Sequence, residues 1–229
     1  MDKFKIILWD IDGTLLNFKE AEKEAIRTCF SIFELGECTD EMLHSYSKIN
    51  KRYWERLERA EITKKEVLEG RFREFFKMYG LDETLAPKVN AEYQVRLGDT
   101  ICFNDNALEL IKTCKDKVLQ YAVTNGTRIA QERKLKKSGL GSLFDGVFIS
   151  DVIGIEKPLI GFFEAVFETI GALDKNEIMI VGDSLTSDMQ GGINAGIATC
   201  WYNPEHKKND KMLNIDYEIS NLSQVLDLI

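Results

Sequence analysis

The stretch that decides the fold is FKIILWDIDGTLLNF, residues 4–18. An apolar run from Phe4 to Trp9 ends in two aspartates, Asp10 and Asp12, with one residue between them. Carboxylates this close repel each other, which costs free energy unless another group compensates their charge. The stretch therefore predicts either a simple turn at the end of a strand or an acidic site. The rest of the sequence decides between the two.

Short apolar runs recur along the chain, and each ends in polar residues or glycine. The runs predict strands at residues 5–9, 118–123, 147–149, 178–181 and 198–202. Stretches with helical periodicity lie between them, at residues 107–114, 130–137, 160–170 and 189–195. Strands that alternate with helices are typical of a parallel α/β sheet, and runs that are apolar on both faces fit a sheet covered on both sides. We predict a Rossmann-like α/β core.

Residues 18–97 break this alternation. They are rich in charged and aromatic residues at helical spacing, and they predict four helices with breaks near residues 36–39, 60–63 and 80–83. The simplest architecture is an all-helical cap domain, residues 18–97, inserted into an α/β core of residues 1–17 and 98–229. We expect the hinges of a moving cap near residues 16–18 and 97–100.

Polar residues follow the predicted strands where ligands bind in an open α/β sheet, at the carboxyl ends. Asp10 and Asp12 follow the first strand, and Thr124 and Asn125 follow the second. The remaining strands are followed by three further polar residues: Lys157, Asp183 and Asp188. Acids, a hydroxyl group and a lysine are therefore expected at one edge of one sheet.

Three carboxylates at one place, those of Asp10, Asp12 and Asp183, call for a hard divalent cation such as Mg²⁺. A lysine and the backbone N–H groups of a Thr-Asn-Gly turn suit phosphate oxygens. This combination favours phosphoryl transfer, with Asp10 as the nucleophile that forms an aspartyl-phosphate. We expect Asp12 to point away from Asp10, to protonate the leaving oxygen and then to take a proton from water.

These residues resemble a known family. D-x-D-G-T-L (10–15), T-N-G (124–126), K-P (157–158) and G-D-S-x-x-S-D (182–188) are similar, in this order, to the four motifs of the haloacid dehalogenase superfamily. The resemblance implies that Asp10 is nucleophile and metal ligand and that Asp12 is general acid and base and binds the metal through its backbone carbonyl. It also implies phosphate binding by Thr124, Asn125 and Lys157. Asp183 would complete the Mg²⁺ site and Asp188 would support it.

A narrower resemblance is to the bacterial pyrimidine 5'-nucleotidases. It rests on T-L-L-N-F (14–18), I-N-K-R-Y-W (49–54), E-G-R-F (69–72) and G-G-I-N-A-G-I-A-T-C-W-Y-N (191–203). It implies a Mg²⁺-dependent phosphatase acting on nucleoside 5'-monophosphates such as dUMP, UMP and dTMP. In the cap, Asn50, Trp54 and Arg71 are candidates for substrate contact, and a purely structural role for Trp54 and Arg71 is equally supported.

Three alternatives remain open. The same scaffold could hydrolyse phosphoglycolate or a sugar phosphate, it could be a haloacid dehalogenase, or it could be a binding protein without activity. Asp12 argues against a dehalogenase because a haloacid offers no leaving oxygen to protonate. Every catalytic position of the superfamily is filled, which argues against an inactive protein.

Composition narrows the partners. The 229 residues carry a net charge of −8, which disfavours binding to a nucleic acid polymer or an anionic membrane. The five cysteines are scattered and no apolar segment reaches the length of a membrane span, so we expect a cytoplasmic protein with free thiols. The two histidines follow no predicted core strand, which disfavours a Ser-His-Asp hydrolase or a zinc enzyme. We expect a small phosphomonoester as the partner and a monomer or homodimer.

Overall fold

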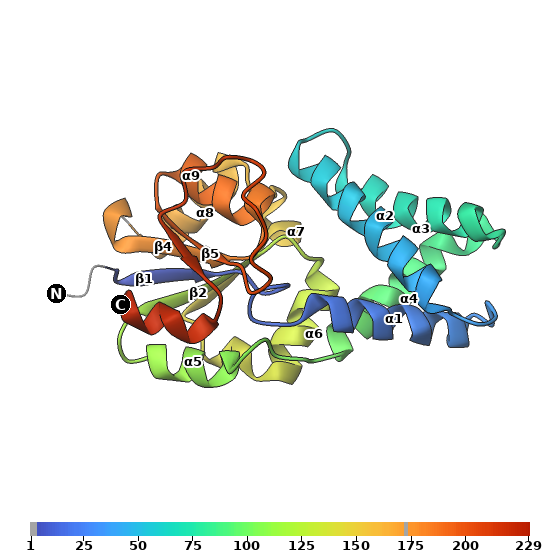
Figure 1. Cartoon of the computed structure of the whole chain (residues 1–229), viewed down its shortest axis with the longest axis horizontal. Helices are drawn as coiled ribbons and strands as arrows, with labels where there is room; N and C mark the ends of the chain where they lie inside the picture. The colour runs from blue at the N-terminus through green and yellow to red at the C-terminus, as the bar shows by residue number, and fades with distance from the viewer. Residues whose placement is uncertain (1–3, 172–173) are drawn as a thin grey trace. The chain divides into compact units, whose positions relative to one another are not determined.

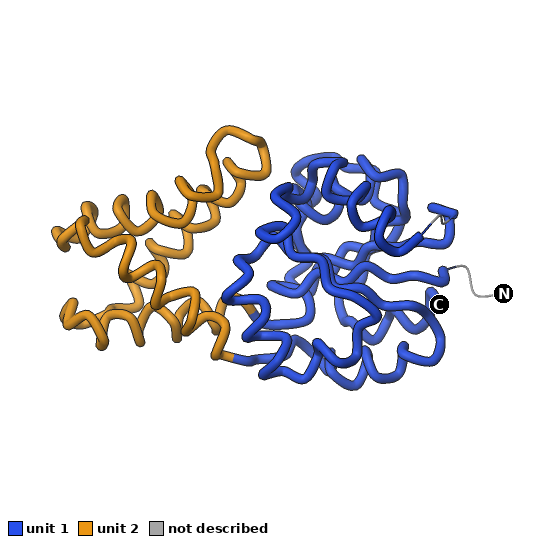
Figure 2. Tube along the Cα trace, turned by 180° about the vertical axis from the view of Figure 1, so that it is seen from behind, with its two compact units in different colours: residues 1–17, 101–229 blue, residues 18–100 orange. Residues whose placement is uncertain are grey.

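The structure is a computed structural model that describes residues 4–171 and 174–229 (Figure 1). The chain divides into two compact units, coloured separately in Figure 2. One unit comprises Met1–Asn17 and Ile101–Ile229, and the other comprises Phe18–Thr100.

The first unit is built on a parallel sheet of six strands in the order β3-β2-β1-β4-β5-β6. The strands are β1 (Ile6–Trp9), β2 (Leu119–Thr124), β3 (Gly146–Ile149), β4 (Ile178–Gly182), β5 (Ala198–Tyr202) and β6 (Tyr217–Ile219). The predicted Rossmann-like α/β core is confirmed. The sequence did not reveal β6, because it has only three residues and one of them is exposed.

Strand β1 lies between β2 and β4, and all three strands end near one another. Trp9, its last residue, pairs with Ala122 of β2 and with Val181 of β4. The ends of the three strands therefore lie side by side, and Asp10 follows directly from the middle strand. This register brings polar residues from three distant parts of the sequence to one sheet edge.

Helices cover both faces of the sheet (Figure 1). They are α5 (Ala107–Cys114), α6 (Arg128–Ser138), α7 (Ser150–Ile153), α8 (Ile160–Ile170) and α9 (Gln190–Ala195). Short helical turns are η2 (Leu140–Ser142), η3 (Lys175–Glu177), η4 (Leu185–Met189) and η5 (Leu222–Asp227). On one face Ile7 and Trp9 pack in a cluster with residues of α5 and η5. On the other face Ile6 and Leu8 pack in a cluster with Phe162 and Phe163 of α8.

One predicted helix keeps its bounds and another begins one residue late. The helix predicted at residues 160–170 is α8, which runs from Ile160 to Ile170. The helix expected from Met189 begins at Gln190, because the preceding residues form the π-helical turn η4. Ser184 caps that turn, and its side chain accepts a hydrogen bond from the backbone N–H of Ser187.

All the secondary-structure elements of the second unit, residues 18–100, are helices. They are α1 (Phe18–Ile32), α2 (Asp40–Glu58), α3 (Lys64–Tyr79), η1 (Glu83–Leu85) and α4 (Ala86–Asp99). Local signals set their ends: Thr63 and Glu66 form a capping box at the start of α3, and Gly80 ends it with φ of 68°. Phe72, Phe75 and Phe76 are buried, so the aromatic stripe of α3 forms the core of this unit.

Candidate active site

Asp10 lies at the end of β1 and is 6% exposed. Its Oδ1 accepts a hydrogen bond from Lys157 Nζ at 2.9 Å, and its Oδ2 accepts one from Thr14 Oγ1 at 2.9 Å. Burial raises the pKa of the Asp10 carboxyl well above its ordinary value, and the negative charge of Asp188 raises it further. Lys157 opposes this rise. Asp10 is therefore a carboxylate that needs positive charge nearby to stay ionised.

Lys157 supplies part of that charge. Its side chain is fully buried, and its ammonium group also donates to Asp188 Oδ1 at 2.6 Å and to the carbonyl oxygen of Val123 at 3.0 Å. Burial lowers the pKa of this lysine, but the charges of Asp10 and Asp188 outweigh burial and raise it above its ordinary value. The ammonium group therefore stays charged beside Asp10.

The predicted Thr-Asn-Gly turn begins at Thr124, the last residue of β2, and the side chain of its asparagine holds the backbone of Lys157 in place. Asn125 Nδ2 donates to the carbonyl oxygen of Lys157 at 2.8 Å, and Asn125 Oδ1 accepts from the backbone N–H of Lys157 at 2.8 Å. Thr124 is buried, and its Oγ1 accepts from the backbone N–H of Gly126 at 3.2 Å. Of the three residues predicted to bind phosphate, Asn125 thus uses its side chain to fix the backbone of another, Lys157.

Asp183 follows β4 and lies against the turn that follows β1. A Cβ atom added to Gly13 would lie 2.5 Å from Asp183 Oδ1, and Gly13 has φ of 98°. The backbone carbonyl of Asp183 accepts a hydrogen bond at 3.0 Å from the indole N–H of Trp201, which is buried in β5. Burial first and the charge of Asp188 second raise the pKa of Asp183 to about 7. No pattern in the sequence indicated that Trp201 supports this acid.

Three carboxylates form one cluster at this edge. Oxygen atoms of Asp10, Asp183 and Asp188 lie within 4.8 Å of one another. Asp188 can approach because Gly182 has no side chain: a Cβ there would lie 2.3 Å from Asp188 Cγ. Hard oxygen donors at this spacing fit an octahedral Mg²⁺ ion, whose ligands stand about 2.1 Å from the metal. The carboxylates that cluster are thus those of Asp10, Asp183 and Asp188.

The carboxylate of Asp12 contacts residues of α6 instead of the acidic cluster. Gln131 Nε2 donates to Asp12 Oδ2 at 2.7 Å, and Lys134 forms an ion pair with Asp12 Oδ1. Residues two apart in a strand share a face, so strand alternation cannot separate Asp10 from Asp12. They reach different partners because β1 ends at Trp9 and the chain turns at residues 11–14.

Sequence reasoning missed Gln131 and Lys134. The surrounding RIAQERKLKKS of α6 is strongly polar and looks like a solvated helix. In the structure the buried residues of α6 recur at helical spacing and include both: Ala130, Gln131, Lys134, Leu135 and Ser138. Of these only Ala130 and Leu135 are apolar, so the sequence shows no apolar stripe that would have indicated the buried face.

Two of the three cap candidates, Asn50 and Arg71, are buried in the interior of the helical unit. Arg71 Nη1 donates to Asn50 Oδ1 at 2.6 Å, and Asn50 Nδ2 donates to Glu22 Oε1 at 2.7 Å. Glu22, Asn50 and Arg71 are each at most 3% exposed, and burial raises the pKa of Glu22. Trp54 is half-buried, with Lys64 Nζ 6.0 Å from the centre of its ring. Asn50 and Arg71 therefore belong to a buried polar network that also includes Glu22, which the sequence did not reveal.

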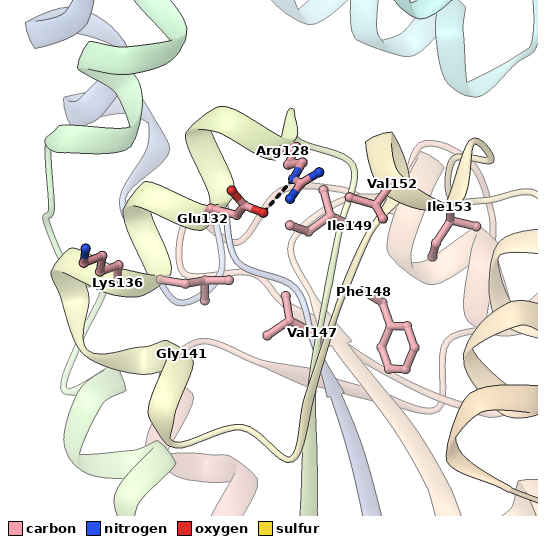
Figure 3. A pocket seen from close by; sticks show the side chains of 10 residues that line it. Arg128, Glu132, Lys136, Gly141, Val147, Phe148, Ile149, Val152 and Ile153 are labelled. Carbon is pink, nitrogen blue, oxygen red and sulfur yellow. Dashed lines mark hydrogen bonds and ion pairs between the residues drawn. The ribbon is translucent and has the colours of Figure 1, made fainter.

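A separate pocket of about 590 Å³ lies along the edge strand β3 (Figure 3). Apolar residues such as Val147, Ile149 and Val152 line it, together with Arg128 and Glu132 of α6, which form an ion pair at 2.7 Å. None of the predicted site residues is among those that line it. The chemistry gathers at the carboxyl ends of β1, β2 and β4 instead.

Comparison with known proteins agrees with this fold and identifies the family. The family model of the haloacid dehalogenase-like hydrolases matches residues 4–196. The chain belongs to this family of hydrolases. The match covers β1 through α9 and so includes every strand end that carries a candidate site residue.

Relatives match over the whole chain. The chain is 34% identical to the HAD-hydrolase YfnB of Bacillus subtilis, over 100% of this chain and 97% of YfnB. It is 35% identical to the pyrimidine 5'-nucleotidase PynA of Streptococcus pneumoniae, over 99% of this chain and 95% of PynA. It is 27% identical to the pyrimidine 5'-nucleotidase YjjG of Escherichia coli, over 99% and 98% of the two chains.

A solved structure shares the fold closely. The crystal structure of YfnB bound to magnesium superposes with a TM-score of 0.92 at 33% identity, covering 99% of this chain and 98% of YfnB. That structure is described as revealing an interdomain movement. In the part of the present chain that the structure describes, no helix is long and apolar enough to cross a membrane.

Proposed function

We propose that this hydrolase is a phosphatase that cleaves nucleoside 5'-monophosphates through an aspartyl-phosphate on Asp10. The observation that carries the proposal is the position of Lys157, whose buried ammonium group contacts both Asp10 and Asp188 beside the three-carboxylate cluster. A lysine so placed can hold a phosphate oxygen against the nucleophile. Asp10, Asp183 and Asp188 offer the carboxylates for a Mg²⁺ ion, with the backbone carbonyl of Asp12 as a further ligand.

The first step is attack of an Asp10 oxygen on phosphorus. The new bond joins that oxygen to phosphorus, the ester P–O bond breaks, and the leaving nucleoside oxygen takes a proton from Asp12. Lys157 and the backbone N–H groups of the turn at residues 124–126 bind the phosphoryl oxygens. Bound Mg²⁺ supplies positive charge that offsets the negative charge of the carboxylates and the phosphate.

The second step returns the enzyme to its starting state. A water molecule gives a proton to Asp12 and attacks phosphorus, and the bond between phosphorus and the Asp10 oxygen breaks. Inorganic phosphate leaves, and Asp12 is protonated again. The two steps use Asp12 first as an acid and then as a base, which matches a side chain that is separate from the carboxylate cluster.

Pyrimidine nucleotides are the proposed substrates. The support is the full-length similarity to PynA and YjjG, both named pyrimidine 5'-nucleotidases. The proposed division of labour gives the chemistry to the α/β core and substrate choice to the helical cap, residues 18–97 in the sequence prediction. Closure of the cap about residues 16–18 and 97–100 would exclude water from the reaction.

A substrate panel tests the proposal. Phosphate release is measured for dUMP, UMP, dTMP, AMP, phosphoglycolate and glucose 6-phosphate, each with Mg²⁺ and with excess chelator. We expect the pyrimidine monophosphates to give the highest kcat/KM and the chelator to abolish release. High activity on phosphoglycolate or the sugar phosphate, with none on the nucleotides, would replace the substrate assignment. Absence of phosphate release from every ester would overturn the reaction itself.

A further inference from the structure

The carboxylate of Asp12 is held from both oxygens by one helix. Gln131 donates to Oδ2 at 2.7 Å and Lys134 is ion-paired with Oδ1. The two α6 residues are three apart and therefore lie on the same helix face. Asp12 keeps 19% of its side chain exposed, whereas Gln131 and Lys134 are at most 1% exposed. Helix α6 thus contacts the buried side of the Asp12 carboxylate, which remains partly exposed.

The turn before α6 is shaped to allow this contact. A Cβ atom on Gly126 would lie 2.1 Å from Gln131 Nε2 and 2.7 Å from Gln131 Cδ. A side chain at this position would displace the Gln131 amide from its observed path to Asp12. Thr127 caps α6 by accepting from the backbone N–H of Ala130, which fixes where the helix begins. Gly126 and Thr127 together set the reach of Gln131.

An apolar side chain could fill the buried position of Lys134 as well as a lysine does. Burying an ammonium group costs several kcal/mol unless an opposite charge and hydrogen bonds compensate it. The neighbouring Lys136 and Lys137 of the same helix are exposed, as lysines usually are. Lys134 alone among these three points inward, and its carboxylate partner is the proposed acid and base of the reaction.

We propose that Gln131 and Lys134 are positioning residues that fix the carboxyl group of Asp12 for proton transfer. This inference rests on the function proposed above. Each carboxyl oxygen has two lone pairs, so an oxygen that accepts one hydrogen bond from α6 keeps a site for the transferred proton. Holding both oxygens prevents the carboxyl group from rotating and limits it to one orientation relative to Asp10.

The two chemical steps respond differently to the loss of this positioning. A nucleoside alkoxide leaves slowly without a proton, so cleavage of a nucleotide needs Asp12 in place. The p-nitrophenolate ion is a good leaving group and departs without protonation. Hydrolysis of the aspartyl-phosphate needs Asp12 as a base for either substrate. A badly placed Asp12 therefore slows both steps with UMP but only the second step with p-nitrophenyl phosphate.

Rapid-mixing kinetics with the full chain and saturating Mg²⁺ measure both steps. The variants are Lys134→Met and Gln131→Leu, which keep the side-chain volume approximately constant. Lys136→Met, an exposed lysine on the same helix, is the matched control. We expect kcat on UMP to fall by about 10²-fold or more in Lys134→Met. With p-nitrophenyl phosphate we expect the burst of p-nitrophenol to keep its rate while the steady-state rate falls. The ratio of the two rates therefore rises above its wild-type value.

The outcomes separate this inference from the proposed function. Equal losses in the burst and the steady-state rate, with no change in their ratio, would show a purely structural role and overturn the inference alone. Wild-type rates in both variants would overturn it as well. Gln131→Leu removes no charge and keeps the test decisive if Lys134→Met does not fold. If the wild type hydrolyses neither ester, both proposals fall together.

Discussion

The backbone of Gly13 passes so close to the carboxylate of Asp183 that a methyl group on Gly13 would lie 2.5 Å from Asp183 Oδ1. Real Cβ contacts essentially never reach this distance, and Gly13 also has φ of 98°, which disfavours any L side chain. Gly13→Ala should displace Asp183 and weaken Mg²⁺ binding by ~10-fold or more, as changes that disturb a metal ligand do. Calorimetric titration with Mg²⁺ measures the affinity.

Gly154→Ala is the control for the backbone strain. Gly154 has φ of 83°, but a Cβ atom there would meet nothing within 4 Å. We expect both variants to lose about 1–2 kcal/mol of unfolding free energy, because each forces alanine into the left-handed region. Only Gly13→Ala should lose metal affinity. Equal affinity in the two variants would show that the Gly13–Asp183 contact does not shape the metal site.

Asp10→Asn tests the nucleophile. The amide keeps the size of the side chain and its ability to pair with Thr14, but it cannot attack phosphorus. We expect kcat to fall by ~10³-fold or more. The thermal midpoint should stay near the wild-type value, since the substitution removes a buried carboxylate whose pKa is raised by burial. A variant that retains more than a tenth of wild-type turnover would exclude Asp10 as the nucleophile.

The pH dependence of stability follows from Asp183, whose pKa is raised to about 7, chiefly by burial. In the unfolded chain an aspartate titrates near pH ~3.9. The folded state without metal therefore binds the proton more tightly, and stability falls as pH rises from ~4 to ~7. Mg²⁺ displaces that proton, so its stabilising effect should grow over the same range. Thermal unfolding with and without Mg²⁺ at pH 5.5 and pH 8 measures the difference.

Asp183→Asn provides the comparison for that experiment. The amide carries no proton to displace, so the part of the Mg²⁺ effect that varies with pH should shrink. A Mg²⁺-induced shift of the thermal midpoint that is the same at both pH values in the wild type would contradict the assignment of Asp183 as a metal ligand.

Trp201→Phe removes one hydrogen bond and keeps an aromatic ring in β5. The lost bond is the 3.0 Å contact from the indole N–H to the backbone carbonyl of Asp183. Groups that orient a metal ligand contribute about 10- to 100-fold to affinity. We expect Mg²⁺ affinity to fall within that range and the KM for nucleotide at saturating Mg²⁺ to change little. Unchanged Mg²⁺ affinity would show that this bond does not orient Asp183.

The polar network inside the cap predicts non-additive stability changes. Asn50 bridges Glu22 and Arg71, so Arg71→Met leaves the buried Glu22 carboxylate without that positive charge. Breaking a direct buried ion pair costs about 3–5 kcal/mol, and we expect a smaller loss here because Asn50 lies between the two charges. Glu22→Gln in the Arg71→Met background should restore part of this loss. Chemical denaturation of the two single variants and the double variant measures the coupling, and additive changes would contradict it.

The fold was predictable because strong local patterns agree with it. Apolar runs predicted five of the six strands, and breaks near residues 36–39, 60–63 and 80–83 separated the four cap helices. Strand β6 escaped prediction because Glu218, between Tyr217 and Ile219, interrupts an already short run. The start of α9 was predicted one residue early because a π-helical turn at Leu185–Met189 precedes it. A single π-helical turn leaves no recognisable periodicity in a sequence.

The candidate site was predictable as far as its residues follow strands. Asp10, Asn125 and Asp183 do so directly, and Thr124 is itself the last residue of β2. Long-range partners could not be found this way: Gln131 and Lys134 contact a residue about 120 positions earlier, and nothing near them in the sequence specifies that contact. Asn50 and Arg71 lie in cap segments that resemble the bacterial pyrimidine 5'-nucleotidases, and nothing near them in the sequence indicated that they pair with each other inside the helical unit.

The central place of β1 has a consequence for biosynthesis. Its neighbours β2 and β4 begin more than a hundred residues later in the chain, so the strand that leads to Asp10 leaves the ribosome long before either edge can be paired. Pairing of strands that lie far apart in the sequence is generally slower than the formation of local helical structure. A chain interrupted before Ile178 therefore carries Asp10 without Asp183 or Asp188, and the acidic cluster exists only in a chain whose translation has passed η4.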